Sequence, residues 1–278
     1  MMKFSLDARK TVSENAQLYY DKSKKAAKKI KGAKIALDKT NEKIKALDRT
    51  ELVEVNVPKK KEPVKKKYWF ERFRFFTSSD GFLVVGGKDA STNENLIKKH
   101  TSGGDIVYHS QVQGAPFFVV KNPENKLIPE STGRQVAQAA AAYSKAWSQG
   151  IGSVDVYYVS PEQVSKDAPS GEYLPKGAFM IYGRKKWERN TPLYVAVGFV
   201  IGREGVEVIG GPVEAVKSKT DLFVQLTPGS KKSKELASEI RKKVADKTKK
   251  EYRPLIEKIS LQEIQCWIPA GKGRIKKR

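Results

Sequence analysis

The segment YWFERFRFFTSSDGFLVVGGKDASTNE, residues 68–94, concentrates aromatic, arginine and glycine residues in a short span. Its alternation at every second position predicts a strand with one basic and aromatic face, formed by Phe70, Arg72, Arg74 and Phe76. Asp80-Gly81 predicts a hairpin turn into an apolar strand at residues 82–85. Ser91 and Glu94 have the spacing of a helix capping box. The segment therefore predicts a strand, a turn, a second strand and the start of a helix.

The rest of the chain predicts an α+β domain with a mixed sheet, because helices follow strands without strict alternation. Hydrophobic patterns predict further strands at residues 105–110, 116–121, 154–159, 178–182, 193–201, 206–209 and 221–227. Helices are predicted from Thr132, with Gln135 as its capping partner, to a stop at Gly150, and also after Pro212 and at residues 233–248. The last eight residues, GKGRIKKR, are expected to carry too much charge to pack.

The first fifty residues contain a heptad pattern, which predicts a long N-terminal helix of a coiled-coil arm, about 50 Å in length. The seam is weak because it contains alanines and hydroxyl residues, so a partner helix or self-association is expected. Docking of this helix on the globular part is the alternative. The seam consists of Val12, Ala16, Tyr19, Ser23, Ala26, Ile30, Ala33, Leu37, Thr40, Ile44 and Leu47.

The net charge of +23 is concentrated at the two ends of the 278-residue chain. Residues 1–67 carry 20 Lys/Arg against 9 Asp/Glu, residues 228–278 carry 16 against 6, and the middle carries 18 against 16. Such flanks favour a polyanionic partner, since each neutralised phosphate releases counterions. Solvated lysine-rich helices are the simpler alternative. The predicted boundaries are an arm at 1–55, a basic Pro/Lys linker at 56–67, a central domain at 68–227 and a basic helical extension and tail at 228–278.

The composition excludes several classes of protein. With Cys266 as the single cysteine, an intramolecular disulfide and a cysteine-based zinc site are impossible. The longest apolar run, at residues 193–201, is about half of the ~20 residues that a membrane span needs, and no secretory signal pattern opens the chain. We therefore expect a cytoplasmic protein that binds no metal and no cofactor and does not act at a membrane.

Ordered blocks of sequence carry a resemblance to a known family. The segment at 68–94, GDIVYH at 104–109, QAAAAYSKAWSQG at 138–150, VYYVSPEQVSK at 156–166 and PSGEYLPKGAFMIYG at 169–183 follow one another over more than a hundred residues. Together they resemble the NFACT-R RNA-binding domain of the NEMF/RqcH ribosome quality-control family. Residues 5–37 are similar to the second helix of that family's coiled-coil arm. Its N-terminal NFACT domain and helix-hairpin-helix region have no counterpart here, so the chain resembles the C-terminal portion.

This resemblance implies a function. Members of the family bind the large ribosomal subunit obstructed by peptidyl-tRNA, recruit tRNA and support untemplated C-terminal tailing of the stalled chain. The peptidyl-transferase centre of the ribosome would supply the chemistry, so no catalytic residue is expected in this chain. The resemblance and the basic residues together give ten expected RNA contacts: Arg72, Arg74, Lys88, Asn93, His109, Lys121, Arg134, Arg184, Lys185 and Lys186.

Two short motifs suggest how RNA could be held. Gly86-Gly87-Lys88 does not satisfy the phosphate-loop pattern GxxxxGK[ST], which excludes a nucleoside triphosphatase of that type. A glycine turn before a helix can still present N–H groups to one RNA phosphate, unless Ser91 and Glu94 satisfy those groups. Arg184, Lys185 and Lys186 form the densest basic patch of the central domain, predicted in a hairpin loop beside an aromatic residue, Trp187.

His109 is the basis of an alternative function. A hydrolase or nucleic-acid-processing enzyme could use this histidine with carboxylates such as Asp80 or Asp105, provided that the three converge in one cleft. The family pattern has an acidic residue soon after the matching histidine, whereas Ser110 and Gln111 stand here, which weakens an acid-assisted role. A further alternative, an extracellular adhesin, conflicts with the missing export signal.

Overall fold

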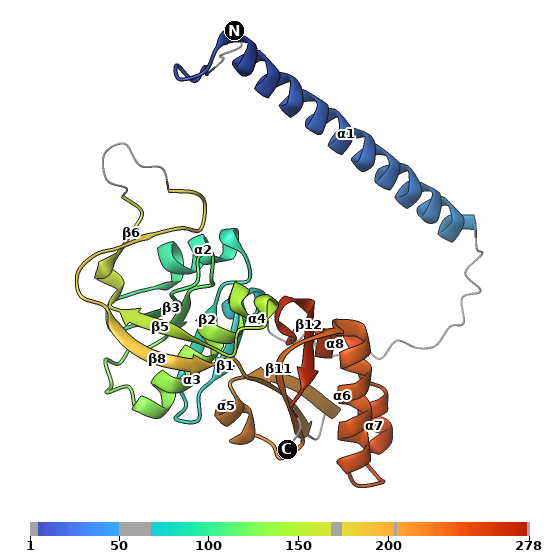
Figure 1. Ribbon diagram of the computed structural model, residues 1–278. Coiled ribbons are helices and arrows are strands. Elements are labelled where there is room, and N and C mark those ends of the chain that lie inside the picture. Colours follow the sequence, from blue (N-terminus) through green and yellow to red (C-terminus); the bar gives the residue numbers. More distant parts are fainter. Residues whose placement is uncertain (1–4, 50–67, 168–173, 203–204, 277–278) are drawn as a thin grey trace. The chain divides into compact units, whose positions relative to one another are not determined.

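The computed structural model describes residues 5–49, 68–167, 174–202 and 205–276 (Figure 1). Two compact units, residues 1–65 and 66–278, divide the chain and are described separately here. The basic linker predicted at 56–67 lies outside the described residues. Within the described residues, no helix is long and apolar enough to cross a membrane.

The first unit is built on one long helix, α1 (Val12–Arg49), as the heptad pattern predicts. Its 38 residues correspond to about 57 Å at ~1.5 Å per residue. Asn15 ties the preceding loop to the helix, because its side chain donates to the carbonyl of Asp7 at 3.0 Å and its Oδ1 accepts from the Asp7 N–H at 2.9 Å. Ile30 and Leu37 of the seam are 68% and 62% exposed. Association through this seam remains a prediction.

The second unit contains a six-stranded sheet among its described residues. Each of its strand pairings is antiparallel. Asp80-Gly81 turns between the first two strands, as predicted, and Gly81 has a φ of +90° that favours glycine. The strand order is β1 (Arg74–Thr77), β2 (Leu83–Gly86), β4 (Phe118–Val120), β3 (Ile106–Ser110), β5 (Ser153–Val159) and β8 (Lys186–Pro192).

The two faces of this sheet enclose separate cores, because neighbouring strand residues point to opposite faces. Val85 and Val119 pack on one face with Leu96 of α2 (Ala90–His100). Val84 and Val120 pack on the other face in the core that includes α3 (Glu130–Ala142). Edge strands β1 and β8 are five inter-strand steps of about 4.8 Å apart, or about 24 Å.

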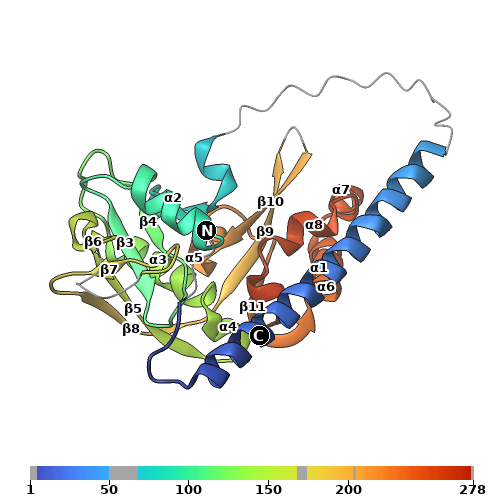
Figure 2. The same cartoon turned by 90° about the horizontal axis from the view of Figure 1, so that it is seen from above.

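A second sheet and the C-terminal helices belong to the same core as α3. Its strand order is β10 (Gly205–Gly211), β9 (Val195–Gly202), β11 (Phe223–Lys232) and β12 (Lys272–Ile275). Figure 2 shows the C-terminal helices gathered beside this sheet: α6 (Ser233–Lys247), α7 (Arg253–Glu257) and α8 (Leu261–Gln265). Val136 of α3, Leu226 of β11 and Ile240 of α6 share one buried cluster. The remaining elements are α4 (Lys145–Gln149), α5 (Val213–Lys217), the short pair β6 (Val164–Ser165) and β7 (Met180–Ile181), and 3-10 turns at Trp69–Arg72, Pro161–Gln163 and Pro269–Gly271.

The α+β class is confirmed, and three predictions about strands are wrong. All strand pairings in the two sheets are antiparallel among the described residues, where a mixed sheet was expected. The opening strand is half as long as predicted, since Trp69–Arg72 forms a 3-10 turn. The charged C-terminal end does pack: Lys272–Ile275 pairs with β11 through backbone groups, and Gly273 is buried. Because β11 runs through residue 228, the predicted boundary there falls inside a strand.

The predicted helix starts also differ from the structure. Asp89 caps α2, because its side chain accepts from the Thr92 N–H at 2.8 Å, whereas Ser91 and Glu94 were expected to form the cap. Helix α3 begins after Pro129, so Thr132 and Gln135 lie inside it. The long helix predicted from Thr132 is interrupted after Ala142, and Ser144 caps the separate helix α4.

Candidate RNA-binding surface

The three adjacent cations Arg184, Lys185 and Lys186 lie at an edge of the first sheet. Lys186 is the first residue of edge strand β8, where a hairpin loop was predicted. The Nζ atom of Lys185 lies 4.6 Å from the Tyr157 ring centroid, and that of Lys186 lies 6.0 Å from the Tyr158 centroid. Tyr157 and Tyr158 pack into cores on opposite faces of the sheet. The two lysines therefore place positive charge on both sides of one edge.

These three charges have no acidic partner within the part of the chain that the structure describes. Gln163 holds the preceding turn, because its Nε2 donates to the carbonyls of Tyr182 at 2.7 Å and Arg184 at 3.1 Å. The side chain of Arg184 is left exposed. The neighbouring Arg189 differs, since it pairs with Asp155 at 2.6 Å. Along this edge, the cations without an ion pair among the described residues therefore lie at the start of β8.

Arg134 is brought beside the same edge by helix α3, which packs against β8. Together with Glu188 and Arg189 of β8 it lines a cavity of about 350 Å³. The Arg134 side chain is exposed and its Nη1 lies 3.4 Å from Glu130. Burial raises the pKa of the Glu188 carboxyl, which also lines this cavity. The sequence separation of about fifty residues between Arg134 and β8 hid this adjacency, and no local pattern could have revealed it.

The predicted shared face of Arg72 and Arg74 is not found. Arg72 lies in the 3-10 turn, and its guanidinium contacts His100 at 2.7 Å and Asn95 at 3.3 Å on the side of α2. Arg74 lies in β1 and its guanidinium carbon is 4.2 Å from the Tyr143 ring centroid, on the side of α3. Both arginines are at the β1 edge, about 24 Å from the β8 edge by strand spacing. The expected RNA contacts therefore do not form one patch.

The glycine turn before α2 does not offer free N–H groups. The N–H groups of Lys88 and Asp89 both donate to the Thr92 hydroxyl, at 2.8 and 2.9 Å, and that of Gly87 donates to the Phe117 carbonyl at 3.0 Å. These N–H groups are therefore bonded inside the protein. Thr92 and Phe117 accept from them, whereas the sequence suggested Ser91 and Glu94. Partial burial, followed by the charge of Arg74, lowers the pKa of the Lys88 side chain. The ammonium group of Lys88 can thus contact an RNA phosphate, but its backbone N–H cannot, because that group already donates to Thr92.

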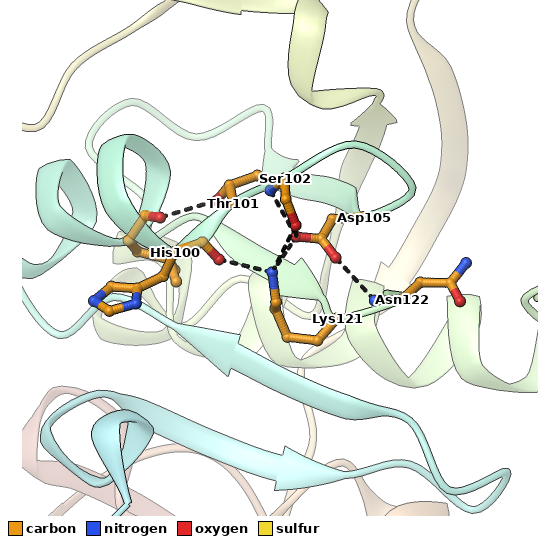
Figure 3. A network of polar contacts seen from close by, with 7 residues as sticks. His100, Thr101, Ser102, Asp105, Lys121 and Asn122 are labelled. Atoms are coloured by element: carbon orange, nitrogen blue, oxygen red, sulfur yellow. Dashed lines mark hydrogen bonds and ion pairs between the residues drawn. The ribbon is translucent and has the colours of Figure 1, made fainter. Parts of the chain in front are cut away.

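The side chains of Asn93 and Lys121 bond to other groups of the same domain. Asn93 is buried, and its Oδ1 accepts from the Phe117 N–H at 3.2 Å. Figure 3 shows Lys121 between two segments: its Nζ donates to the His100 carbonyl at 2.8 Å and pairs with Asp105. Asp105 is 2% exposed and its other oxygen accepts from the Asn122 N–H at 2.8 Å. Because these polar atoms are engaged inside the protein, neither residue contributes to the surface proposed below.

His109 is mostly buried and uncharged. Burial is the main cause that lowers its pKa to about 4. Its Nε2 lies 3.0 Å from the Ala115 carbonyl, and its ring packs against Phe117 with a centroid distance of 4.4 Å. A neutral imidazole in this position donates from Nε2, since a carbonyl oxygen can only accept. The ring therefore has a structural contact and carries no positive charge for RNA at neutral pH.

The carboxylates considered with His109 are engaged elsewhere. Asp80 accepts from the hydroxyls of Ser131 at 2.7 Å and Thr132 at 2.6 Å, which lowers its pKa. Asp105 pairs with Lys121. No hydrogen bond joins either carboxylate to His109 in the described part of the chain. Over the same residues, no group of three or more His, Cys, Asp or Glu side chains is arranged to hold a metal ion.

Comparison with known proteins gives the class of this domain. Residues 72–183 match the family described as NFACT protein RNA binding domain, which covers the first sheet up to its edge strand together with α2, α3 and α4. The second unit is therefore built around an NFACT-type RNA-binding domain. The matched range ends at Gly183, one residue before the cations of the β8 edge.

Relatives that match a longer part of the chain than this domain identify its family. The chain is 42% identical over 182 residues to the archaeal Rqc2 homolog aRqcH of Methanocaldococcus jannaschii, covering 66% of this chain and 27% of that protein. It is 37% identical over 185 residues to the human ribosome quality control complex subunit NEMF, covering 66% of this chain and 17% of that protein. The chain belongs to the NEMF/RqcH family. Its matched segment spans about a quarter or less of the length of these relatives.

A solved structure also matches, the C-terminal part of the fibronectin/fibrinogen-binding protein from Streptococcus suis. It shares 22% identity and a TM-score of 0.37, over 66% of this chain and 78% of that chain. A likeness of this size supports no conclusion about function.

Proposed function

We propose that this chain is the RNA-binding module of a ribosome-associated quality-control factor and that it binds tRNA and the large ribosomal subunit. One observation carries this proposal. Directly after the range that matches an RNA-binding family, three adjacent cations, Arg184, Lys185 and Lys186, lead into the edge strand β8 and have no acidic partner among the described residues. A lysine on an edge strand also prevents pairing with other chains. One charge is enough to prevent such pairing, so it does not account for three cations in succession.

The geometry suits a phosphate backbone better than a base edge. Lys185 and Lys186 project to opposite faces of the sheet, so a strand of RNA that crosses the edge meets a cation on either side. Arg134 adds a further positive group on the α3 side. Neutralised phosphates release counterions, so affinity arises without readout of sequence and falls with salt. Folded RNA is commonly recognised through its shape and backbone in this way.

The finer role is proposed by analogy with relatives such as human NEMF, which is named a subunit of the ribosome quality control complex. In this proposal the module acts in the cytoplasm on large subunits obstructed by peptidyl-tRNA and supports untemplated C-terminal tailing of the stalled chain. The ribosome would supply the chemistry, and the chain requires neither a cofactor nor a catalytic residue of its own. Because the matched segment spans only 27% and 17% of these two relatives, tailing by this chain alone is not expected.

An enzyme centred on His109 is the less favoured function. It requires a carboxylate within hydrogen-bonding reach of the imidazole, about 2.6–3.2 Å. Asp80 and Asp105 bond to other groups instead, and the imidazole bonds to a backbone carbonyl. No observation favours catalysis at this position.

Replacing Arg184, Lys185 and Lys186 together by alanine tests the proposal. We expect tRNA affinity to fall roughly tenfold and the slope of log affinity against log salt to become shallower by about 2–3, about one per lost phosphate contact. The melting temperature should change little, because two of the three side chains are exposed.

The matched control removes the same charge elsewhere: Lys217, Lys219 and Lys258, which are exposed and make no ion pair within the described residues. Both triple variants are compared by fluorescence anisotropy with labelled tRNA at several salt concentrations. Equal losses in the two variants would show that only net charge matters and would remove the β8 edge from the proposal.

A further inference from the structure

Two exposed aromatic residues precede the first sheet. The indole of Trp69 is stacked on the His100 imidazole, with ring centroids 4.3 Å apart and an interplanar angle of 8°, yet Trp69 remains 39% exposed. Tyr68 is 61% exposed and stacks on Phe70 at 5.3 Å and 7°. Trp69 and Phe70 also touch, at 5.7 Å, so the two stacks are neighbours. A tryptophan that keeps so much surface in solvent has π-surface available for another ring.

The imidazole beneath Trp69 is held by a hydrogen bond and is uncharged. Arg72 lies 2.7 Å from Nε2 of His100, and because a guanidinium can only donate, Nε2 must be the unprotonated nitrogen. Burial, followed by the charges of Arg72, Lys121 and Lys99, lowers the pKa of His100. Lys121 holds the end of α2 through the His100 carbonyl (Figure 3). A neutral, fixed imidazole therefore backs one face of the indole.

The cations Arg72 and Lys99 both act on His100, the residue that supports Trp69. The last turn of α2 contains Lys98, Lys99 and His100. Lys98 pairs with Glu94 at 2.8 Å, while Lys99 is exposed and has no ion pair in the part of the chain described. Among the described residues, the side-chain hydrogen-bond partners of Arg72 are Asn95 and His100, which are both neutral. One acidic residue is close: Glu71, whose carboxylate accepts from the Tyr68 N–H at 3.0 Å. The surroundings favour a ligand that combines a flat ring with negative charge.

We propose that Tyr68 and Trp69 form a stacking platform for an unpaired RNA base, with Lys99 and Arg72 placed for the phosphates beside it. The proposal rests on the proposed RNA-binding function and adds a contact at the β1 edge, about 24 Å by strand spacing from the cations of the β8 edge. Bases in a duplex are stacked on one another and cannot reach such a platform, whereas bases in loops can. The platform thus distinguishes loops from paired regions.

The first experiment compares two RNAs of equal phosphate number, a stem-loop with unpaired bases and a blunt duplex, on the full chain. For Trp69→Ala we expect stem-loop affinity to fall by about 5- to 100-fold, the equivalent of one base–aromatic stack, with duplex affinity changed less than about twofold. Trp69→Phe should retain most of the stem-loop affinity. The matched control is Leu127→Ala, which truncates an apolar side chain that is 91% exposed and should change neither affinity.

The second experiment does not depend on any variant. Stem-loop RNA with 5-iodouridine at its unpaired positions is photo-crosslinked to the wild-type chain, and the modified peptides are mapped by mass spectrometry. Crosslinks at Tyr68 or Trp69 support the platform. Crosslinks confined to other aromatic residues, or equal losses for both RNAs in Trp69→Ala, overturn it while leaving RNA binding intact. If the wild-type chain binds neither RNA, the proposed function and the platform both fail.

Discussion

Protonation of His109 should make folding of the second unit dependent on pH. In the unfolded chain this histidine titrates near its usual value of 6.5, whereas burial lowers its pKa to about 4 in the folded protein. Between these values the unfolded state binds one more proton than the folded state, so stability falls as the pH falls from 6.5 to 4. The loss ends below the folded pKa, where both states are protonated.

The magnitude follows from the size of the shift. One pKa unit corresponds to about 1.4 kcal/mol, so the shift in His109 amounts to about 3 kcal/mol in total. About 2 kcal/mol of this should be lost between pH 7 and pH 4.5. A His109→Gln variant has no group that titrates at this position, and its amide can donate to the Ala115 carbonyl as the imidazole does.

Urea denaturation at a series of pH values, followed by circular dichroism, measures the effect. Other groups titrate in both proteins, so the difference between the wild-type and His109→Gln curves isolates His109. We expect the wild-type free energy of unfolding to fall by about 2 kcal/mol more than that of the variant from pH 7 to pH 4.5. Parallel curves would show that His109 protonates freely in the folded state and would refute the burial account.

Two further predictions concern stability. Lys121→Met leaves the buried carboxylate of Asp105 without a counter-charge, so urea denaturation should show a loss of about 3–5 kcal/mol in the free energy of unfolding. The control is Lys126→Met, which breaks an exposed pair and should cost less than about 1 kcal/mol. A destabilisation as small as that of the control would mean that the Lys121 pair is not buried in solution. Gly87→Ala would place a Cβ atom 1.8 Å from Oδ1 of Asn93, so thermal melting should show a loss of about 1–3 kcal/mol as that hydrogen bond breaks. Gly103→Ala, where no atom lies within 4 Å, is its control, and equal melting temperatures would contradict the close packing at Gly87.

Local sequence patterns predicted most of the secondary structure because most elements here bury one face. The apolar run before Gly86 is strand β2, and the alternation near His109 is strand β3. Gly150 ends α4 with a φ of +75°, as a glycine after a helix commonly does. In these segments the hydrophobic period and the stop residue agree with the tertiary structure.

The elements that were missed are held by partners distant in the sequence. Strand β8, KWERNTP, has no apolar alternation because it lies at an edge and buries little on either face. Strand β12 is stabilised by backbone pairing and by the Trp147 indole, which donates to the Lys272 carbonyl at 2.6 Å, so its charged side chains gave no indication of it. Local sequence patterns cannot reveal the contact between Trp147 and Lys272, which joins residues 125 positions apart.

The candidate site shows the same limit. The cations at the start of β8 could be picked out from the sequence by their density, but their position on an edge strand and the adjacency of Arg134 required the fold. Arg72 was assigned to the wrong element, and its contact with His100 joins residues 28 apart in the sequence. Asn93 and Lys121 were expected to contact RNA, whereas burial gives them partners inside the domain.

The most direct test of the central proposal is to identify the RNA that the chain contacts and the residues that contact it. The purified chain is mixed with large ribosomal subunits and total tRNA and crosslinked by ultraviolet light, after which the bound RNA is sequenced and the modified peptides are mapped. We predict enrichment of tRNA and large-subunit RNA, crosslinked peptides that contain Arg184 to Lys186, and a clear decrease in the recovered RNA for the triple alanine variant. Recovery of no RNA, or crosslinks that persist unchanged in that variant, would contradict the proposal.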